Sequence, residues 1–349
     1  MSKRAVTGIL VLAGWMMACG CDGMGTAGTG VNTDAAIDHY VQAQIHRERD
    51  NSDAALDALG KAIRDDPTLA VAHESMGDIY RKRESYKLAA RSYEESCRIN
   101  PYGFRQHYNL GVTYQYLADA AESLKEMQAN IRKAVDVYLR AITIDPSDFD
   151  ANINLSACYY QLGRYAQAEQ YCKRALELKP GSASAYSNLG TIYDAQGRPY
   201  KAISAYKTAL ETDSSIPRLR LNLGSTYMRQ GTAKSLNTAI DLFGEAADRN
   251  PRDAAPHELM GLSYFYLRDY DKSLAAYERA LKRDPNSAAA HRGVGVALMS
   301  LYVKTKDTAL RDRALKAWHR SLEIDDRQPK LIRLIREFSP KVTAPEIGS

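Results

Sequence analysis

The sequence lacks a strong charge of either sign. Its 349 residues include 47 lysines and arginines against 42 aspartates and glutamates, a formal net charge of +5. Lys3 and Arg4 lie in a segment that we expect to be removed, which leaves 45 basic residues against 42 acidic ones, or +3. This balance, together with the absence of a long basic run, argues against binding to nucleic acid or to an anionic membrane surface.

The sequence also lacks the short signatures of common catalytic and cofactor sites. It contains no P-loop, no nucleophile elbow, no HExxH metal motif and no glycine-rich dinucleotide turn. We therefore expect no catalytic residues, no cofactor and no metal site, and we expect that the protein is not an enzyme.

Hydrophobic runs of membrane-spanning length are not apparent. The apolar stretch at residues 8–18 has 11 residues, whereas a membrane-spanning helix needs about 20. With the basic start at Lys3 and Arg4, the stretch fits a secretory signal peptide, which we place at residues 1–18. The glycine-rich residues that follow predict a flexible tether over 19–35.

The junction at Met16-Met17-Ala18-Cys19 resembles a bacterial lipoprotein signal, in which the cysteine after the cleavage site carries lipid. It has the small residue before Cys19 but departs from the usual leucine and small residue at the two earlier positions. The resemblance implies lipidation at Cys19 and anchoring to a membrane of the bacterial cell envelope. Lipidation at Cys21, cleavage after Gly20 to give a soluble periplasmic or secreted protein, and an uncleaved anchor remain open alternatives.

Internal repeats dominate the rest of the chain. Six similar segments end in proline, at Pro67, Pro101, Pro146, Pro180, Pro251 and Pro285. Three pairs of neighbouring prolines lie 34 residues apart, and Ser214 occupies the proline place 34 residues after Pro180. Because proline cannot continue a helix, each of these positions marks a turn between repeats.

Small and aromatic residues recur in the same register. In six of the repeats one helix carries a small residue followed by an aromatic three positions later, at Gly77/Tyr80, Gly111/Tyr114, Ser156/Tyr159, Gly190/Tyr193, Gly224/Tyr227 and Gly261/Tyr264. The other helix carries a small residue and a large one four later, at Ala89/Tyr93, Ala134/Tyr138, Ala202/Tyr206 and Ala239/Phe243. Such pairs allow two helices to approach closely while the aromatic fills the space beside them.

These motifs resemble those of the tetratricopeptide repeat family over about residues 36–338. The resemblance implies an all-α fold, a right-handed superhelix of about eight helix-turn-helix repeats. We place the superhelix at 36–328 and divide it into 36–69, 70–103, 104–148, 149–182, 183–216, 217–253, 254–287 and 288–328. The third, sixth and eighth repeats exceed 34 residues, and we expect longer helices there. Leu331, Leu334, Ile335 and Phe338 predict an amphipathic capping helix at 329–338, before a disordered tail at 339–349.

Histidine and cysteine do not form a convincing site. His39, His73, His107, His257 and His291 occupy the fourth position of their repeats. Equivalent positions on stacked helices lie about 10 Å apart, too far to share an ion that must be about 2 Å from each ligand. Cys172 replaces the large residue of its second helix and is predicted to be a buried thiol, with a Cys158–Cys172 disulfide as the alternative.

The concave groove is the candidate binding surface, because in this family the first helices line it. The sixth position of four consecutive repeats is Asn109, Asn154, Asn188 and Asn222. This series resembles the asparagine ladder of O-GlcNAc transferase superhelices, which holds the backbone of an extended peptide; no catalytic domain follows here. Further candidate peptide-binding residues are Tyr108, Tyr116, Tyr160, Arg229, Phe265 and Tyr266, with Leu262, Val296 and Met299 on the apolar part of the same face.

Two classes of function remain open on the sequence. The first is a non-catalytic scaffold or adaptor, tethered to the cell envelope by a lipid anchor, that binds a protein or peptide ligand in its groove. The second is a self-associating structural scaffold whose groove is filled by another copy or by its own tail, so a homo-oligomer is an open alternative. The acidic C-termini of chaperones are disfavoured as ligands, because the family's clamp needs lysine at the fifth position, which reads Glu74, Tyr108, Ile153, Ser187, Leu221, Glu258 and Arg292.

Overall fold

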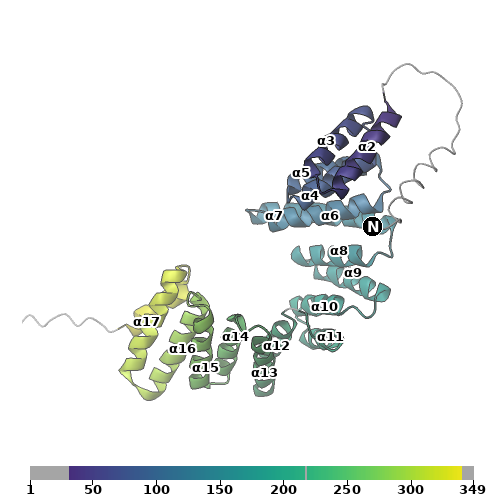
Figure 1. Cartoon of the computed structure of the whole chain (residues 1–349). Helices are drawn as coiled ribbons and strands as arrows, with labels where there is room; N and C mark the ends of the chain where they lie inside the picture. Colours follow the sequence, from purple (N-terminus) through teal and green to yellow (C-terminus); the bar gives the residue numbers. More distant parts are fainter. Residues whose placement is uncertain (1–30, 217, 340–349) are drawn as a thin grey trace, which may run out of the picture.

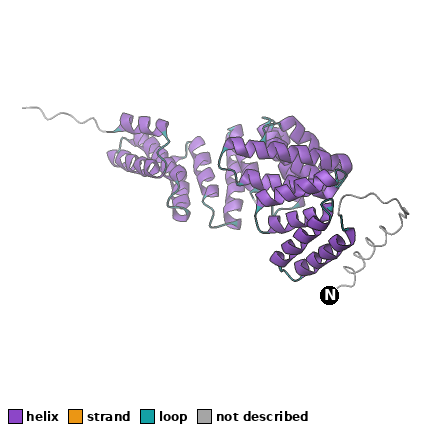
Figure 2. Cartoon of the chain, turned by 90° about the horizontal axis from the view of Figure 1, so that it is seen from above, coloured by secondary structure: helices purple, strands orange, loops and turns teal. Residues whose placement is uncertain are grey.

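The computed structural model describes residues 31–216 and 218–339, and every regular element in this part of the chain is an α-helix (Figure 2). The predicted signal peptide, Cys19 and Cys21, most of the tether and nearly all of the predicted tail lie outside the described residues.

In the described part of the chain, the helices follow one another as eight hairpins and a final single helix. They are α2 (Thr33–Glu48) with α3 (Ser52–Asp65), α4 (Ala70–Lys82) with α5 (Tyr86–Ile99), α6 (Phe104–Asp119) with α7 (Leu124–Ile144), α8 (Phe149–Gln161) with α9 (Tyr165–Leu178), α10 (Ala183–Ala195) with α11 (Pro199–Thr212), α12 (Leu219–Gln230) with α13 (Ala233–Arg249), α14 (Ala255–Tyr266) with α15 (Tyr270–Arg283), α16 (Ala288–Thr305) with α17 (Thr308–Ile324), and α18 (Pro329–Phe338).

The hairpins stack side by side into a curved array (Figure 1). The first helix of most hairpins faces the inner side of the curve, and the second helix faces the outer side. Apolar contacts therefore form clusters along the array instead of one central core: one from α2 to α4, one from α5 to α13 and one from α15 to α18. The predicted all-α superhelix of helix pairs is confirmed.

Close packing at the centre of each hairpin explains the repeated small and aromatic residues. A Cβ added at Gly190 would lie 2.6 Å from the ring of Tyr206, and one added at Gly224 would lie 2.6 Å from the ring of Phe243. Both rings are essentially buried. Glycine on the first helix thus makes the space that the aromatic of the second helix fills.

The longer repeats lengthen their helices, as the sequence predicted. In the third hairpin α6 has 16 residues and α7 has 21, against 13 and 14 in α4 and α5. At the other end of the array, α18 buries Leu331 and Ile335, and the ring of Phe338 lies 6.4 Å from that of Trp318. The predicted cap therefore covers the apolar side of the last hairpin.

Candidate functional site

A polar hollow lies on the inner side of the array, between the first helices of three consecutive hairpins. Its volume is about 290 Å³. It is lined by Tyr160 of α8, by Thr191, Asp194 and Ala195 of α10, by Tyr206 of α11, and by Asn222, Ser225 and Arg229 of α12. The lining therefore combines aromatic surface, an amide, hydroxyls and a charged pair.

An ion pair orients the cation at the edge of this hollow. The Arg229 guanidinium lies 2.6 Å from the Asp194 carboxylate, whose side chain is only 15% exposed, whereas that of Arg229 is 55% exposed. The Thr226 hydroxyl donates to the same carboxylate oxygen at 2.6 Å. Asp194 thus holds Arg229 in place, while the remaining guanidinium N–H groups are available to a ligand.

Packing against a glycine positions the aromatic floor of the hollow. The ring of Tyr206 lies over Gly190, and its hydroxyl donates to the Thr191 hydroxyl at 3.1 Å. Burial raises the pKa of Tyr206, so this hydroxyl is a neutral donor at physiological pH. The floor is therefore fixed by the same glycine and aromatic pair that holds the hairpin together.

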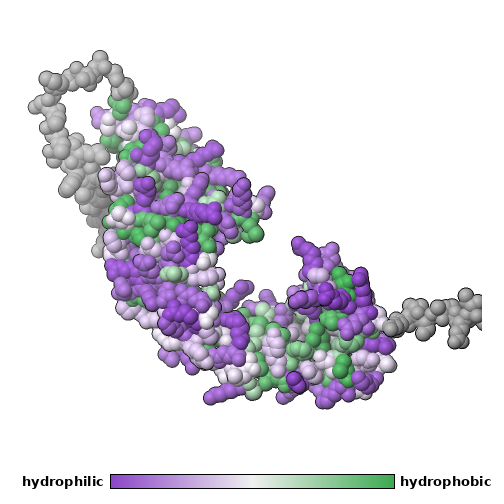
Figure 3. Space-filling view, turned by 180° about the vertical axis from the view of Figure 1, so that it is seen from behind, coloured by the Kyte–Doolittle hydropathy of each residue, from purple (hydrophilic) through white to green (hydrophobic). Residues whose placement is uncertain are grey.

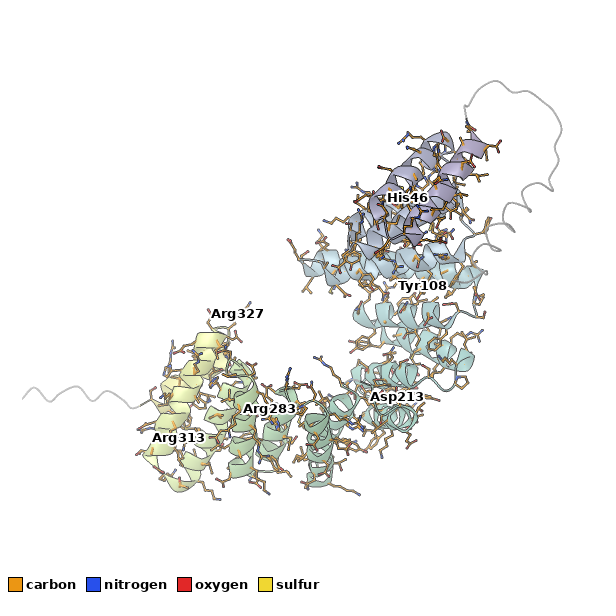
Figure 4. The ribbon with its side chains drawn as sticks, viewed as in Figure 1. His46, Tyr108, Asp213, Arg283, Arg313 and Arg327 are labelled. Carbon is orange, nitrogen blue, oxygen red and sulfur yellow. The ribbon has the colours of Figure 1, made fainter. Side chains whose placement is uncertain are left out.

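The four asparagines of the predicted ladder differ in exposure. Asn109 is only 9% exposed, whereas Asn154, Asn188 and Asn222 are half-buried. Asn222 lines the hollow, and the Asn154 amide donates to the Tyr108 hydroxyl at 3.3 Å. Figure 4 shows Tyr108 on the side of α6 that faces α8. Tyr108 and Asn154 are thus brought together, Asn222 lines the hollow, and three of the four asparagines are partly exposed.

The other predicted aromatic residues fall into separate places. Tyr160 is in the hollow, whereas Tyr116 stacks on Tyr86 with ring centroids 4.8 Å apart, outside the lining of the hollow. Phe265 lines a second, apolar pocket further along the array, and Tyr266 beside it is 55% exposed. The predicted residues therefore do not form one continuous site: Tyr160 and Phe265 line separate hollows, and Tyr116 lines neither.

Two details differ from what the sequence indicated. Met299 is only 5% exposed and packs in the core near Trp318, so it does not belong to the groove surface. Asp194, by contrast, lines the hollow and pairs with Arg229, although the sequence pattern does not mark it as a binding residue. A signal was present, because Asp194 lies six residues after Asn188 in the first helix of its repeat, close to the position that Arg229 takes in the next.

The histidines and cysteines that recur along the chain do not form a metal site in the described residues. Among residues 31–216 and 218–339, no group of three or more His, Cys, Asp or Glu side chains is arranged to hold a metal ion. Cys97, Cys158 and Cys172 are free thiols, and burial raises the pKa of Cys172 to about 12. In the same part of the chain, no helix combines the length and the apolar character needed to cross a membrane.

Stacked helical hairpins, most of which pack a small residue of the first helix against an aromatic residue of the second, define an α-helical repeat scaffold. Two family models, both described as tetratricopeptide repeat, match the chain, one at residues 40–104, 187–254 and 258–312 and the other at residues 148–215. The chain belongs to the tetratricopeptide repeat family. The fold of this family is in general a non-catalytic scaffold for protein–protein interactions, with a concave binding surface.

Solved structures share the fold at low sequence identity. A tetratricopeptide repeat protein from Parabacteroides merdae is 15% identical, with a TM-score of 0.51, over 88% of this chain and 100% of that one. PilF of Pseudomonas aeruginosa is 18% identical, with a TM-score of 0.50, over 63% and 94%. YrrB, described as having an unusual peptide-binding site, is 19% identical, with a TM-score of 0.45, over 58% and 99%. No curated protein matches the sequence.

Proposed function

We propose that this protein is an adaptor that holds an extended segment of a partner protein in its inner groove. The observation that carries the proposal is the polar hollow on α8, α10 and α12, where an asparagine amide, an oriented guanidinium and a tyrosine face one space. These groups are suited to binding a peptide.

The chemistry of the lining fits a peptide main chain. An asparagine amide offers a donor and an acceptor together. Asn222, which lines the hollow, and Asn188, which is half-buried on the neighbouring helix α10, can each pair with both polar groups of a peptide unit. The small side chains of Thr191 and Ser225, one helical turn further on, leave room for the backbone. Arg229, already oriented by Asp194, can donate to a carbonyl or carboxylate of the bound segment.

Tyr108 and Asn154 extend this surface toward α6. In the absence of a partner the Asn154 amide donates to the Tyr108 hydroxyl. A peptide carbonyl can replace that hydroxyl as acceptor, because the distance of 3.3 Å is long for such a bond. The Asn154 amide can therefore exchange its contact with Tyr108 for one with a partner.

We propose further that the adaptor is tethered to the bacterial cell envelope through lipid on Cys19. The support is the order of the sequence: a basic start, an 11-residue apolar stretch, Ala18 and then Cys19. A lipid chain with a glycine-rich tether would hold the groove close to a membrane and leave it free to orient.

Replacement of Asn154, Asn188 and Asn222 together by alanine tests the groove. Each amide left unmatched costs about 1–3 kcal/mol, so the triple variant should bind a peptide ligand at least ~100-fold more weakly. Affinity is measured by titrating peptides selected on the wild-type protein from a displayed random library. Asn237→Ala, an exposed asparagine on α13, is the matched control and should bind as the wild type does.

Thermal melting must accompany the titration. Because the three amides are half-buried on the groove face, the triple variant should unfold at nearly the wild-type temperature. Unchanged affinity in a well-folded triple variant would reject the asparagines as the binding surface. Loss of affinity together with loss of folding would show that they are structural.

Metabolic labelling with a clickable fatty acid tests the tether. The wild type should incorporate the label, Cys19→Ser should abolish it, and Cys21→Ser should leave it unchanged. Absence of label in the wild type would reject the lipid anchor, and label that survives Cys19→Ser would move the anchor to Cys21.

A further inference from the structure

The residues at the ladder positions change character near the C-terminal end of the groove. The sixth position is asparagine in the third to sixth repeats but Leu259 in the seventh and Gly293 in the eighth. The ninth position, which holds Thr191 and Ser225 in the fifth and sixth repeats, is Leu262 in the seventh and Val296 in the eighth. The groove therefore changes from polar groups that suit a main chain to apolar groups that suit a side chain.

These apolar residues enclose a pocket between α14 and α16. Its lining is Glu258, Leu259, Leu262 and Phe265 of α14, Tyr277 of α15, and Ala289, Arg292, Gly293 and Val296 of α16. A Cβ at Gly293 would lie 2.3 Å from the ring of Tyr277, so this glycine is what allows the ring to form the floor. Figure 3 shows apolar surface gathered over this C-terminal arm.

The size of the pocket indicates what it can hold. Its volume is about 260 Å³, below the roughly 300–1,000 Å³ of sites that enclose a drug-sized molecule. It is open to the groove and has few polar groups, which suits one large apolar side chain presented by a longer ligand. The exposed ring of Tyr266, 6.2 Å from that of Phe265, adds apolar surface next to the pocket.

The charged groups at the rim are not equivalent. Glu258 is half-buried and accepts a hydrogen bond from the Ser287 hydroxyl. Arg292 is exposed, and the only side-chain partner of its guanidinium among the described residues is the neutral amide of Gln328, at 3.0 Å. The rim thus offers a cation without a carboxylate partner, which favours an acidic group on the ligand.

We propose that this pocket anchors the partner segment by a large apolar side chain that has an acidic residue next to it. The inference rests on the proposed function, because the segment is the one held by the polar hollow. Asn222 lies on α12, and the pocket lies between the next two first helices, α14 and α16. At about 10 Å between neighbouring helices, the pocket is ~10–15 Å from Asn222. An extended chain covers about 3.3 Å per residue, so the apolar anchor lies about three to five residues from the part held at Asn222.

Selection of a displayed library of random 16-residue peptides tests the anchor. Peptides that bind the wild-type protein should carry Phe, Tyr, Trp, Leu or Met beside Asp or Glu. Val296→Asp, which places a charge in the pocket, should weaken them at least tenfold. Selection on Arg292→Glu should give Lys or Arg in place of the acidic residue. Arg313→Glu, an exposed position on α17 (Figure 4), is the matched control and should select the wild-type pattern.

The outcomes separate the anchor from the groove. Selected peptides that respond to the triple asparagine variant but not to Val296→Asp or Arg292→Glu would overturn the anchor and leave the proposed function standing. Peptides that respond to the pocket variants but not to the asparagines would support a pocket without the main-chain site. Failure to select any peptide would count against both. The melting temperature of each variant shows whether it is folded. If Val296→Asp does not fold, Arg292→Glu, at an exposed site, tests the anchor by itself.

Discussion

Gly190 and Gly224 lie where the two helices of a hairpin approach most closely. An added methyl group would lie 2.6 Å from the ring of Tyr206 or Phe243, a distance at which the buried ring must move. Gly190→Ala and Gly224→Ala should each lower the free energy of unfolding by about 1–3 kcal/mol, measured by urea denaturation. Gly244→Ala, in α13 with no atom within 4 Å of the added group, should instead raise it by about 0.5–1 kcal/mol. Equal effects at the three positions would contradict this account.

His257 makes stability depend on pH. It is 7% exposed, and neither ring nitrogen has a hydrogen-bond partner among the described residues. Burial lowers its pKa, Arg283 and Arg279 lower it further, and Asp248 and Asp253 act in the opposite direction. The unfolded chain, with a pKa of about 6.5, therefore binds the proton more readily than the folded chain.

Stability from the neutral His257 is thus fully present above about pH 6.5 and is lost as pH falls toward the lowered pKa of the folded protein. We expect a decrease in the free energy of unfolding between pH 7 and pH 5 that is smaller in His257→Leu. His319→Gln, at an exposed histidine on α17, should keep the wild-type slope. An unchanged slope in His257→Leu would show that other groups control this pH range.

At the scale of a helix pair, the fourth hairpin departs from the glycine and aromatic pattern on both of its helices. Its first helix has Ser156 where six of the other hairpins have glycine, and its second helix has Cys172 where those six have an aromatic residue. The Ser156 hydroxyl donates to the Ala168 carbonyl at 2.8 Å, and the Cys172 thiol donates to the Ala185 carbonyl at 3.3 Å. A larger residue on one helix is thus matched by a smaller residue on the other.

This pairing predicts a strong coupling between the two sites. Cys172→Tyr alone should destabilise the protein, because the ring would meet the Ser156 side chain. Ser156→Gly with Cys172→Tyr recreates the pattern of the other hairpins and should recover at least ~1 kcal/mol relative to the sum of the single effects. A double-mutant cycle in urea measures the coupling, and strict additivity would show that the two side chains do not share this space.

The capping helix makes a second prediction at this scale. The sequence has two tryptophans, and Trp318 is the one outside the predicted signal peptide. It is 1% exposed beneath α18. A chain that ends at Gln328 should expose it, shift its fluorescence to longer wavelength and lower the melting temperature, since Leu331 and Ile335 no longer cover the hairpin. Lys330→Ala, at an exposed site on α18, should change neither signal.

At the scale of the whole molecule, the array is open and curved around its inner side (Figure 3). A compact globule of about 300 residues would have a radius of gyration of roughly 19 Å. We expect small-angle scattering of the purified protein to give a clearly larger value and the mass of one chain. A mass of two or more chains would favour the alternative in which another copy fills the groove, and a compact single chain would contradict the open array.

The repeat period is where sequence and structure agree most fully. The 34-residue spacing of Pro67 and Pro101, and the recurrence of Gly190 with Tyr206, are local signals that each repeat carries within itself. Because each hairpin contacts mainly its neighbours, such signals determine the helices, their pairing and the residues at each helix crossing. The longer helices of the third repeat and the cap after Gln328 followed from the same patterns.

The site could be predicted only in part. The sequence placed Asn154, Asn188 and Asn222 on one face, but whether a side chain is accessible depends on how the neighbouring repeats pack against it. Asn109 occupies the same register position and is nonetheless buried. The partnership of Asp194 with Arg229 is likewise a contact between two stacked repeats, which spacing within one repeat does not reveal.

By itself, then, the sequence determined the class of fold, the helix pairs and the face on which the groove lies, because these depend on periodic contacts within and between adjacent helices. The tertiary structure decided which amides are accessible, which cation is held by a carboxylate and which, like Arg292, lacks such a partner in the described part of the chain. The physical reason is that burial, ion pairing and the shape of a pocket are set by the curvature of the stack, which brings together side chains from three or more helices.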